Sequence, residues 1–148
     1  NNKDGTFTEL SQLWGITHTA QGRGISCLDY DKDGDIDILI ANNGASPTLY
    51  QNNNLTSNHY LAVKLIGDEK NPDAVGAKIK VTTGNTKQMR EIRLGSNYLS
   101  NDPLIAHFGL GESNLVNTLE IIWPNGATSI FHNIRVDKEL EIKQQRMN

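Results

Sequence analysis

The chain has 148 residues, of which 36% are hydrophobic, and this composition is ordinary for a globular protein of one domain, or of one domain and a fragment. Its formal net charge of −3 leaves no basic surplus for binding nucleic acid or an anionic membrane. No apolar run approaches the roughly 20 residues of a membrane-spanning helix, so we expect no membrane insertion. The sequence contains no signal-peptide pattern, and we expect it to be a piece cut from a longer protein.

The first 28 residues alternate turn signals with short apolar stretches. Asp4-Gly5 predicts a tight turn leading into a short strand at Phe7, and residues 8–16 are expected to hold a brief helical turn. Three apolar side chains of this turn are expected to face inward: Leu10, Leu13 and Trp14. A strand is predicted over residues 25–28. It contains the chain's single cysteine, Cys27, which we expect to be a buried core thiol with no disulfide partner.

An acidic loop follows, with five carboxylates at alternate positions: Asp29, Asp31, Asp33, Asp35 and Asp37. Carboxylates this close repel one another, and a bound Ca²⁺, which takes about six to eight oxygen ligands, removes the repulsion. We expect side-chain oxygens from four of them and a backbone carbonyl from Asp35, with Gly34 at the sharp turn. The alternative is a solvated acidic turn that binds nothing.

The loop opens as an EF-hand does, but it differs where an EF-hand has its final glutamate. That position holds Ile40, and residues 36–40 are rich in β-branched side chains that predict a strand where an EF-hand continues as a helix. A turn at 42–44 and a strand at 48–50 follow. The first third therefore predicts four short strands separated by turns, the make-up of one propeller blade.

From residue 58 onward, apolar and polar residues alternate as they do in half-buried strands, and turn residues separate the stretches. Strands are predicted over six ranges: 61–66, 77–82, 90–94, 119–123, 128–131 and 139–143. Strands at this spacing predict an antiparallel β-sandwich or small barrel. The whole chain is expected to be all-β.

Several phrases in residues 1–54 can be compared with known families: Asp4-Gly5-Thr6-Phe7, Gly24-Ile25, Asp29-x-Asp31-x-Asp33-Gly34-x-x-Asp37 and Leu49-Tyr50-x-Asn52. Together they resemble an FG-GAP/VCBS repeat, the calcium-binding blade of integrin-type β-propellers. The resemblance implies one blade at residues 1–54, with Ca²⁺ stabilising its exposed hairpin. It also implies that the remaining blades of the parent protein are partners of this one.

Further phrases fill residues 55–148: Asn58-His59-Tyr60-Leu61, Val75-Gly76-Ala77-Lys78-Ile79, Gly95-Ser96-x-Tyr98-Leu99-Ser100, His107-Phe108-Gly109-Leu110-Gly111 and Trp123-Pro124-x-Gly126. In this order they resemble the ASPIC/UnbV domain, which closes off proteins carrying FG-GAP repeats. Asn97 stands where a second glycine is expected, and asparagine tolerates the positive φ that a glycine would take there.

Catalytic patterns are missing from the sequence. The four histidines share no zinc-binding spacing, and we expect His107 to have a structural role, hydrogen-bonding a turn. Trp123 is expected to be a core residue, with a sugar-stacking platform of Trp123, Tyr98 and Tyr60 as the alternative. The acidic loop places five carboxylates in one environment, whereas a glycosidase needs two in different environments. We therefore expect no enzymatic activity.

These observations predict a non-enzymatic, calcium-binding module for adhesion to, or recognition of, a protein or glycan. Millimolar Ca²⁺ outside the cell suits an open loop of moderate affinity, so we expect an extracellular, cell-surface or periplasmic setting. The alternative is an accessory or catalytic domain of a carbohydrate-acting enzyme. Binding to a glycan array without turnover favours the first interpretation, and release of reducing ends favours the second.

Overall fold

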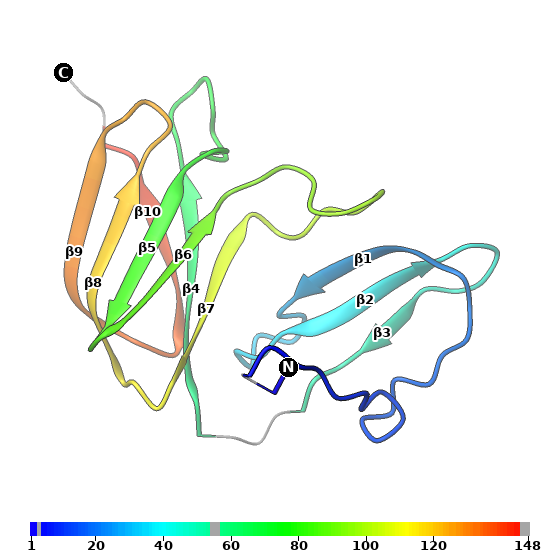
Figure 1. The fold of residues 1–148 in the computed structure, drawn as a ribbon. Coiled ribbons are helices and arrows are strands. Elements are labelled where there is room, and N and C mark those ends of the chain that lie inside the picture. The colour runs from blue at the N-terminus through cyan, green and yellow to red at the C-terminus, as the bar shows by residue number, and fades with distance from the viewer. Residues whose placement is uncertain (3, 54–56, 146–148) are drawn as a thin grey trace.

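The computed structural model describes residues 1–2, 4–53 and 57–145, and within these residues it contains strands and turns but no helix. Two parts lie side by side: a small N-terminal sheet and a C-terminal pair of packed sheets (Figure 1). The expected all-β fold is confirmed. In the same residues no helix is long and apolar enough to cross a membrane. The boundary expected between residues 54 and 55 lies outside the described residues.

The N-terminal sheet has three antiparallel strands in the order β1-β2-β3: β1 (Gly22–Leu28), β2 (Asp37–Asn42) and β3 (Thr48–Tyr50). The strands predicted on either side of the acidic loop are present, and the loop joins β1 to β2. The prediction of four strands is wrong for the described residues, because Phe7 lies in no strand. Residues 11–15 form hydrogen-bonded turns, and Trp14 N donates to Leu10 O at 3.0 Å, the bond of a single helical turn, as expected for residues 8–16.

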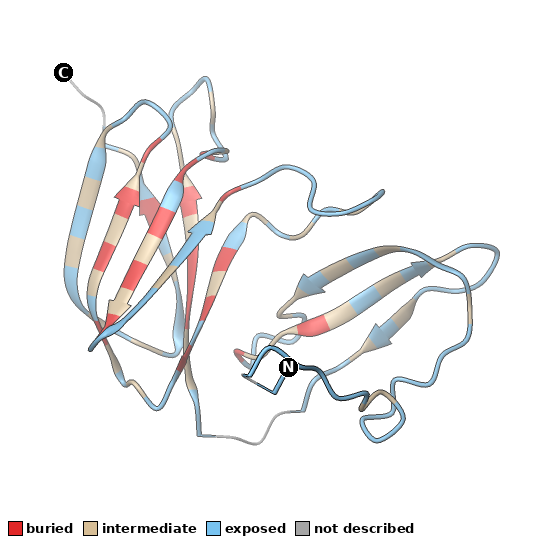
Figure 2. Ribbon diagram, viewed as in Figure 1, coloured by how far each residue is buried: buried red, intermediate tan, exposed pale blue. Residues whose placement is uncertain are grey.

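The burial expected in this part is also wrong at several positions. Leu13 and Trp14 are 77% and 70% exposed, and Cys27 is exposed on β1. The physical reason is that little packs against either face of this sheet, so that Leu39 of β2 and Leu49 of β3 are exposed as well. Figure 2 shows the contrast: buried positions are frequent along the C-terminal strands, whereas the N-terminal sheet has one buried band where β2 begins.

The C-terminal part is a sandwich of a three-stranded sheet, β10-β4-β7, and a four-stranded sheet, β6-β5-β8-β9. The strands are β4 (His59–Ile66), β5 (Lys78–Thr83), β6 (Thr86–Glu91), β7 (Ile105–Gly111), β8 (Leu115–Ile122), β9 (Thr128–Arg135) and β10 (Lys138–Lys143). The described strands form a sandwich and no closed barrel. All neighbours are antiparallel except β10 and β4, which run parallel.

Three details of the predicted strands differ from the structure. The sandwich is not wholly antiparallel, because the chain enters β10 beside the start of β4, where Asp137 N donates to Tyr60 O at 2.8 Å. The strand predicted over 90–94 lies at β6, which ends at Glu91. Strand β7 was not predicted. Glycines at positions 109 and 111 weaken its β-propensity, although its buried residues Ala106, Phe108 and Leu110 alternate.

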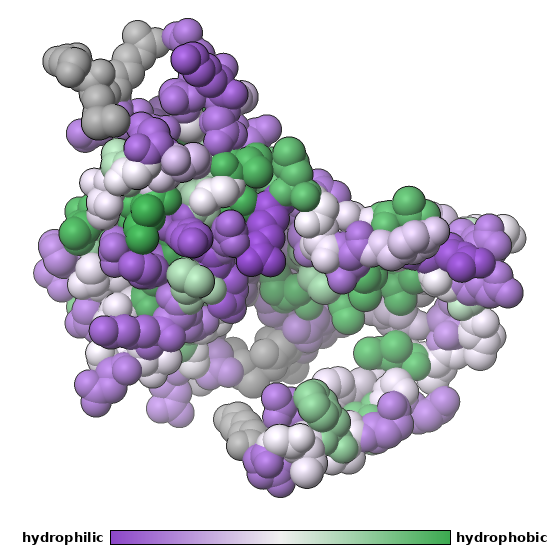
Figure 3. Space-filling view, turned by 45° about the horizontal axis from the view of Figure 1, so that its top comes forward, coloured by the Kyte–Doolittle hydropathy of each residue, from purple (hydrophilic) through white to green (hydrophobic). Residues whose placement is uncertain are grey.

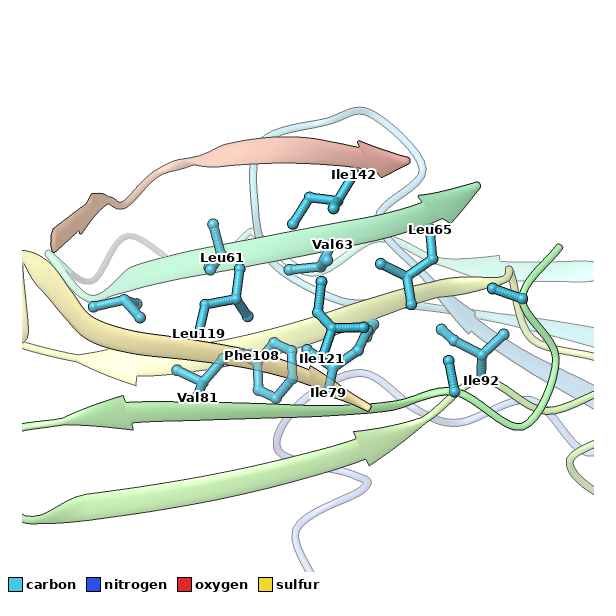
Figure 4. Close-up of a cluster of buried hydrophobic side chains, with 14 of the residues drawn as sticks. Leu61, Val63, Leu65, Ile79, Val81, Ile92, Phe108, Leu119, Ile121 and Ile142 are labelled. Carbon is cyan, nitrogen blue, oxygen red and sulfur yellow. The ribbon is translucent and has the colours of Figure 1, made fainter. Parts of the chain in front are cut away.

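The core lies between the two sheets and follows the predicted period of two. Leu61, Val63 and Leu65 of β4 are 0 to 3% exposed, and they point toward side chains from the opposite sheet such as Ile79 and Leu119 (Figure 4). Burying each such side chain contributes about 1.5–3 kcal/mol. Trp123 is 2% exposed and its Nε1–H donates to Ser129 Oγ at 2.9 Å, which confirms it as a core residue.

Candidate metal centre

The acidic loop brings three of its five aspartates together. One carboxylate oxygen from each of Asp29, Asp31 and Asp37 lies within 4.8 Å of the other two. Two ligands held by one Ca²⁺ at about 2.3–2.6 Å cannot lie more than about 5.2 Å apart, so this spacing fits a shared calcium ion. Strands β1 and β2 fix the two ends of the loop, because Leu28 pairs with Asp37.

Asp37 is the anchor of the loop. Its side chain is fully buried, its Oδ2 accepts a hydrogen bond from Tyr30 N at 2.8 Å, and its Oδ1 accepts one from Asn52 N at 2.7 Å. Each carboxylate oxygen has a second lone pair that a cation can use. Asp37 therefore ties the start of the loop to the chain after β3, whether or not a cation is present.

Asp29 supplies the strongest sign that the loop suits a cation. Its Oδ2 accepts a hydrogen bond from Gly34 N at 3.1 Å, but its Oδ1 is buried and accepts no hydrogen bond from the described residues. Leaving a buried acceptor without a partner costs about 1–3 kcal/mol, and more for a charged group. A cation between Asp29, Asp31 and Asp37 would supply that partner. Asp31 is held from the other side by the Gln51 amide.

Asp33 and Asp35 lie outside this group of three carboxylates. Asp33 Oδ1 accepts a hydrogen bond from Asp35 N at 3.0 Å, which shapes the tip of the loop. The side-chain ligand expected from Asp33 and the carbonyl ligand expected from Asp35 stay predictions.

The sandwich contacts the loop at Gly34. This glycine has φ +98°, and a Cβ added to it would lie 2.1 Å from Tyr60 Cε1. His107 Nε2 lies 2.9 Å from Gly34 O, which confirms the expected hydrogen bond from His107 to a turn. The rings of Tyr60 and His107 stack, with centroids 5.5 Å apart and planes 5° from parallel. Sequence reasoning placed both residues in family phrases but did not connect Tyr60 to the loop.

The carboxylates of the loop make this contact electrostatically negative. Burial and the nearby carboxylates, Asp29 first among them, raise the pKa of Tyr60. The negatively charged phenolate form of Tyr60 is thus disfavoured, as expected beside a cluster of carboxylates.

A second contact covers the outer edge of β1. Ile25 N donates to Ser100 Oγ at 2.8 Å and Cys27 N donates to Asp102 Oδ1 at 2.9 Å, so side chains replace the carbonyls of a neighbouring strand. The turn before Ser100 has a positive φ at Leu99, +54°, and not at Asn97, so the turn makes no use of the tolerance of asparagine for that conformation.

A cleft of about 1040 Å³ separates the two parts beyond these contacts, and Cys27 and Tyr60 both line it. Figure 3 shows apolar surface gathered where the two parts meet. Although Cys27 is exposed on β1, the walls of the cleft partly desolvate its thiol, and this desolvation, followed by the negative charge of Asp102, raises the pKa of Cys27.

Comparison with known proteins supports the resemblance seen in the sequence motifs of residues 55–148. Residues 67–148 match the family model described as ASPIC and UnbV. The chain belongs to the ASPIC and UnbV family. The match covers β5 to β10 of the sandwich, so the region matched by the family model includes strand β7, which carries His107.

Curated relatives of this ASPIC and UnbV chain include Cartilage acidic protein 1 of Mus musculus, which is 30% identical over 127 residues, 83% of this chain and 19% of the relative. The protein of the same name from Homo sapiens is 29% identical, with the same coverage. That from Xenopus tropicalis is 31% identical over 110 residues, 72% of this chain and 17% of the relative. The chain thus spans about a fifth of these relatives' length. An alignment that covers 83% of this chain is too long to lie within residues 55–148 alone, so the similarity extends into residues 1–54.

Proposed function

We propose that the chain is a non-enzymatic, calcium-binding module of an extracellular protein, serving adhesion or recognition of a protein or glycan. One observation carries the calcium proposal: Asp29, Asp31 and Asp37 converge, and the buried Asp29 Oδ1 accepts no hydrogen bond from the described residues. Ca²⁺ would be held by these three carboxylates and, as the spacing suggests, by oxygens of Asp33 and Asp35. Its role there is to neutralise the loop and stabilise the hairpin.

The extracellular setting rests on the chemistry of the site and on the relatives. An open loop of this type has moderate affinity and suits the millimolar Ca²⁺ found outside cells. The curated relatives are named for cartilage, which supports the same setting.

We further propose that residues 1–54 are one FG-GAP/VCBS blade. Exposed apolar side chains lie on both faces of the N-terminal sheet, with Ile25 on one face and Leu39 and Leu49 on the other. A propeller blade has this property, because its two faces pack against the neighbouring blades. The remaining blades of a longer protein are therefore the nearest partners of this part.

The described histidines support a non-enzymatic module, because each has a structural contact. His59 Nδ1 lies 2.8 Å from Asp137 Oδ2 where β4 and β10 begin, and His107 binds the acidic loop. His18 Nδ1 accepts a hydrogen bond from Ala20 N at 3.2 Å, and His132 Nδ1 lies 3.4 Å from the Thr118 hydroxyl.

The test is calorimetric titration of the chelator-treated chain with CaCl₂, and separately with MgCl₂, followed by thermal unfolding at each concentration. We expect saturable Ca²⁺ binding and a stabilisation of about 2.7 kcal/mol when free Ca²⁺ reaches about 100 times the dissociation constant. No heat of binding and an unchanged melting temperature would contradict the calcium proposal. Incubation of the same samples on glycan arrays, with assays for reducing ends, tests recognition against turnover.

A further inference from the structure

Two Asn-Gly pairs occur in the sequence, Asn43-Gly44 and Asn125-Gly126, and each lies in the turn of a β-hairpin. The turn at Asn43 joins β2 to β3, and the turn at Asn125 joins β8 to β9. All four residues are exposed to solvent. The two turns can therefore be compared directly, and what separates them is how hydrogen bonds hold each pair.

An asparagine that precedes a glycine can convert to an acid without an enzyme. The backbone nitrogen of the glycine attacks the side-chain carbonyl carbon, Cγ, of the asparagine and forms a C–N bond, while the side-chain amide leaves as ammonia and takes the proton of the glycine N–H. Water then adds across one of the two C–N bonds of the cyclic imide, its hydroxyl going to the carbonyl carbon and its proton to the nitrogen. The products are aspartate and isoaspartate. Glycine favours the first step because it has no Cβ to hinder the approach and its backbone moves most freely.

Hydrogen bonds hold the reacting groups at Asn125. The attacking atom, Gly126 N, donates to Trp123 O at 2.9 Å, and Asn125 Oδ1 accepts a bond from Ala127 N at 3.0 Å. Trp123 N also donates to Ala127 O at 2.8 Å, which closes the turn. Gly126 N can reach Cγ of Asn125 only if the turn gives up bonds that stabilise it as it stands.

The attacking atom at Asn43 is not held in this way. Gly44 N donates no hydrogen bond to any residue that the structure describes, and nothing lies within 4 Å of a Cβ added to Gly44. The bonds of Asn43 run to Gln21 instead. Asn43 N donates to Gln21 O at 2.8 Å, and Asn43 Nδ2 lies 3.4 Å from Gln21 Oε1, which is long for a hydrogen bond. These bonds position Asn43 and leave the nitrogen of Gly44 able to approach Cγ.

We infer that Asn43 is a modification site, at which the folded chain deamidates spontaneously to aspartate and isoaspartate, whereas its fold protects Asn125. Water is the one co-reactant. The inference does not depend on calcium, because the turn follows the end of β2 opposite to Asp37, where the acidic loop ends. Figure 1 shows this turn at the end of the N-terminal sheet that points away from the sandwich.

The conversion changes both the charge and the backbone of the turn. A carboxylate in place of the amide adds one negative charge to the formal net charge of −3. Isoaspartate also routes the main chain through the side-chain carbon, which lengthens the turn by one atom. Turn length sets the register of a hairpin, and β3 has three residues with which to pair, so we expect the isoaspartate form to weaken the pairing of β3 with β2. Asn52 N, shortly after β3, bonds to Asp37 Oδ1 at 2.7 Å, so this weakening would also reach the acidic loop.

Incubation of the chain at neutral pH and body temperature, followed by peptide mapping with mass spectrometry, tests the inference. Each conversion raises the mass of its peptide by the difference between a hydroxyl and an amino group, and isoaspartate is identified by its methylation with protein-isoaspartate methyltransferase. We expect Asn43 to convert about tenfold faster than Asn125 or more, equivalent to 1.4 kcal/mol per factor of ten. In guanidinium chloride the two rates should become similar, because the hydrogen bonds of both turns are then lost.

Two variants serve as controls, and Asn125 is an internal standard in both. Gly44→Ala places a methyl group beside the attacking nitrogen and should slow the conversion of Asn43 several-fold. Asn43→Gln should prevent conversion at this position over the same incubation, because a glutamine has to close a larger ring. Hydrogen exchange at β3 should be faster in the purified isoaspartate form than in the fresh chain.

Three results would overturn the inference. The first is an Asn43 that stays intact throughout the incubation, and the second is an Asn125 that converts as fast as Asn43 in the folded chain. The third is a rate at Asn43 that Gly44→Ala leaves unchanged. Equal hydrogen exchange at β3 in the fresh and isoaspartate forms would contradict the expected weakening of the hairpin.

Discussion

His107 and Gly34 are 73 positions apart in the chain, and His107 Nε2 lies 2.9 Å from the carbonyl oxygen of Gly34. Because a carbonyl oxygen only accepts hydrogen bonds, Nε2 carries the proton. The bond joins a strand of the sandwich to the tip of the acidic loop. The shape of the candidate metal centre therefore depends on a residue outside the part of the chain that forms it.

Two substitutions separate the hydrogen bond of His107 from its ring. His107→Phe keeps a ring to stack on Tyr60 but removes the donor, and His107→Gln keeps an N–H donor but removes the ring. We expect the phenylalanine variant to lose about 0.5–1.5 kcal/mol of stability and to bind Ca²⁺ more weakly, because the loop carbonyl loses its partner. The glutamine variant should retain more of the Ca²⁺ affinity. Chemical denaturation and calorimetry measure both, and equal Ca²⁺ affinities would contradict the role of the donor.

Gly34→Ala should be far more damaging than a glycine substitution elsewhere in the same part. The new methyl group would meet the ring of Tyr60 at 2.1 Å, in addition to the backbone strain at φ +98°. Gly44→Ala is the control, because Gly44 has φ +68° and nothing lies within 4 Å of its added Cβ. The control should cost about 1–2 kcal/mol, the usual strain of the left-handed conformation. Equal losses in the two melting temperatures would mean that Tyr60 moves freely away.

Asp31 and Asp37 should respond differently to removal of charge. Asp31→Asn is expected to reduce the Ca²⁺-dependent rise in melting temperature with little effect in chelator, because Asp31 is exposed and, among the described residues, has Gln51 as its one side-chain partner. Asp37→Asn should lower the melting temperature in chelator as well, since an amide nitrogen cannot accept a bond from Tyr30 N or Asn52 N. Thermal unfolding in CaCl₂ and in chelator distinguishes the two effects.

Asp35→Ala completes this series. We assign a backbone carbonyl to Asp35, so its substitution should cost much less of the Ca²⁺-dependent stabilisation than Asp31→Ala does. Equal losses from these two alanine variants would contradict the assignment.

The thiol of Cys27 should react slowly for an exposed cysteine. Burial and the charge of Asp102 raise its pKa above the usual 9.0, and only the thiolate attacks alkylating reagents. Asp102→Asn removes the negative charge while its side-chain oxygen can still accept the Cys27 N–H. The pKa of Cys27 should then fall and alkylation by iodoacetamide at pH 8 should become faster. Glu112→Gln, an exposed control, should leave the rate unchanged, and an unaltered rate in the Asp102 variant would exclude its electrostatic effect.

The sandwich could be predicted from the sequence wherever side-chain burial follows the strand period. Ile79 and Val81 of β5 alternate with polar neighbours, and the structure buries them as predicted. Strand β7 was missed because its glycines mask the same alternation, and the parallel pairing of β10 was missed because pairing partners leave no local pattern.

For the acidic loop as well, features set by neighbouring residues could be predicted, whereas contacts with segments far away in the sequence could not. Its spacing predicted converging carboxylates, and three of them do converge. The contact of the loop with Tyr60 and the contact of β1 with Ser100 could not be predicted, because each joins segments that are far apart in the sequence. The prediction that Leu13 and Trp14 face inward was wrong for a related reason. Amphipathic spacing shows which side of a segment is apolar, but it does not show whether anything packs against that side.

The parallel pairing of β10 with β4 has a consequence for synthesis of the protein. Tyr60 N, at the start of β4, bonds to Asp137 Oδ1 across 77 positions, and the β10 strand that follows supplies one whole edge of its sheet. The nascent sandwich cannot be completed until the ribosome has released residues 138–143. Until then, β4 emerges with an open edge and an apolar face. Chaperones that shield extended apolar segments would act on this protein during that interval.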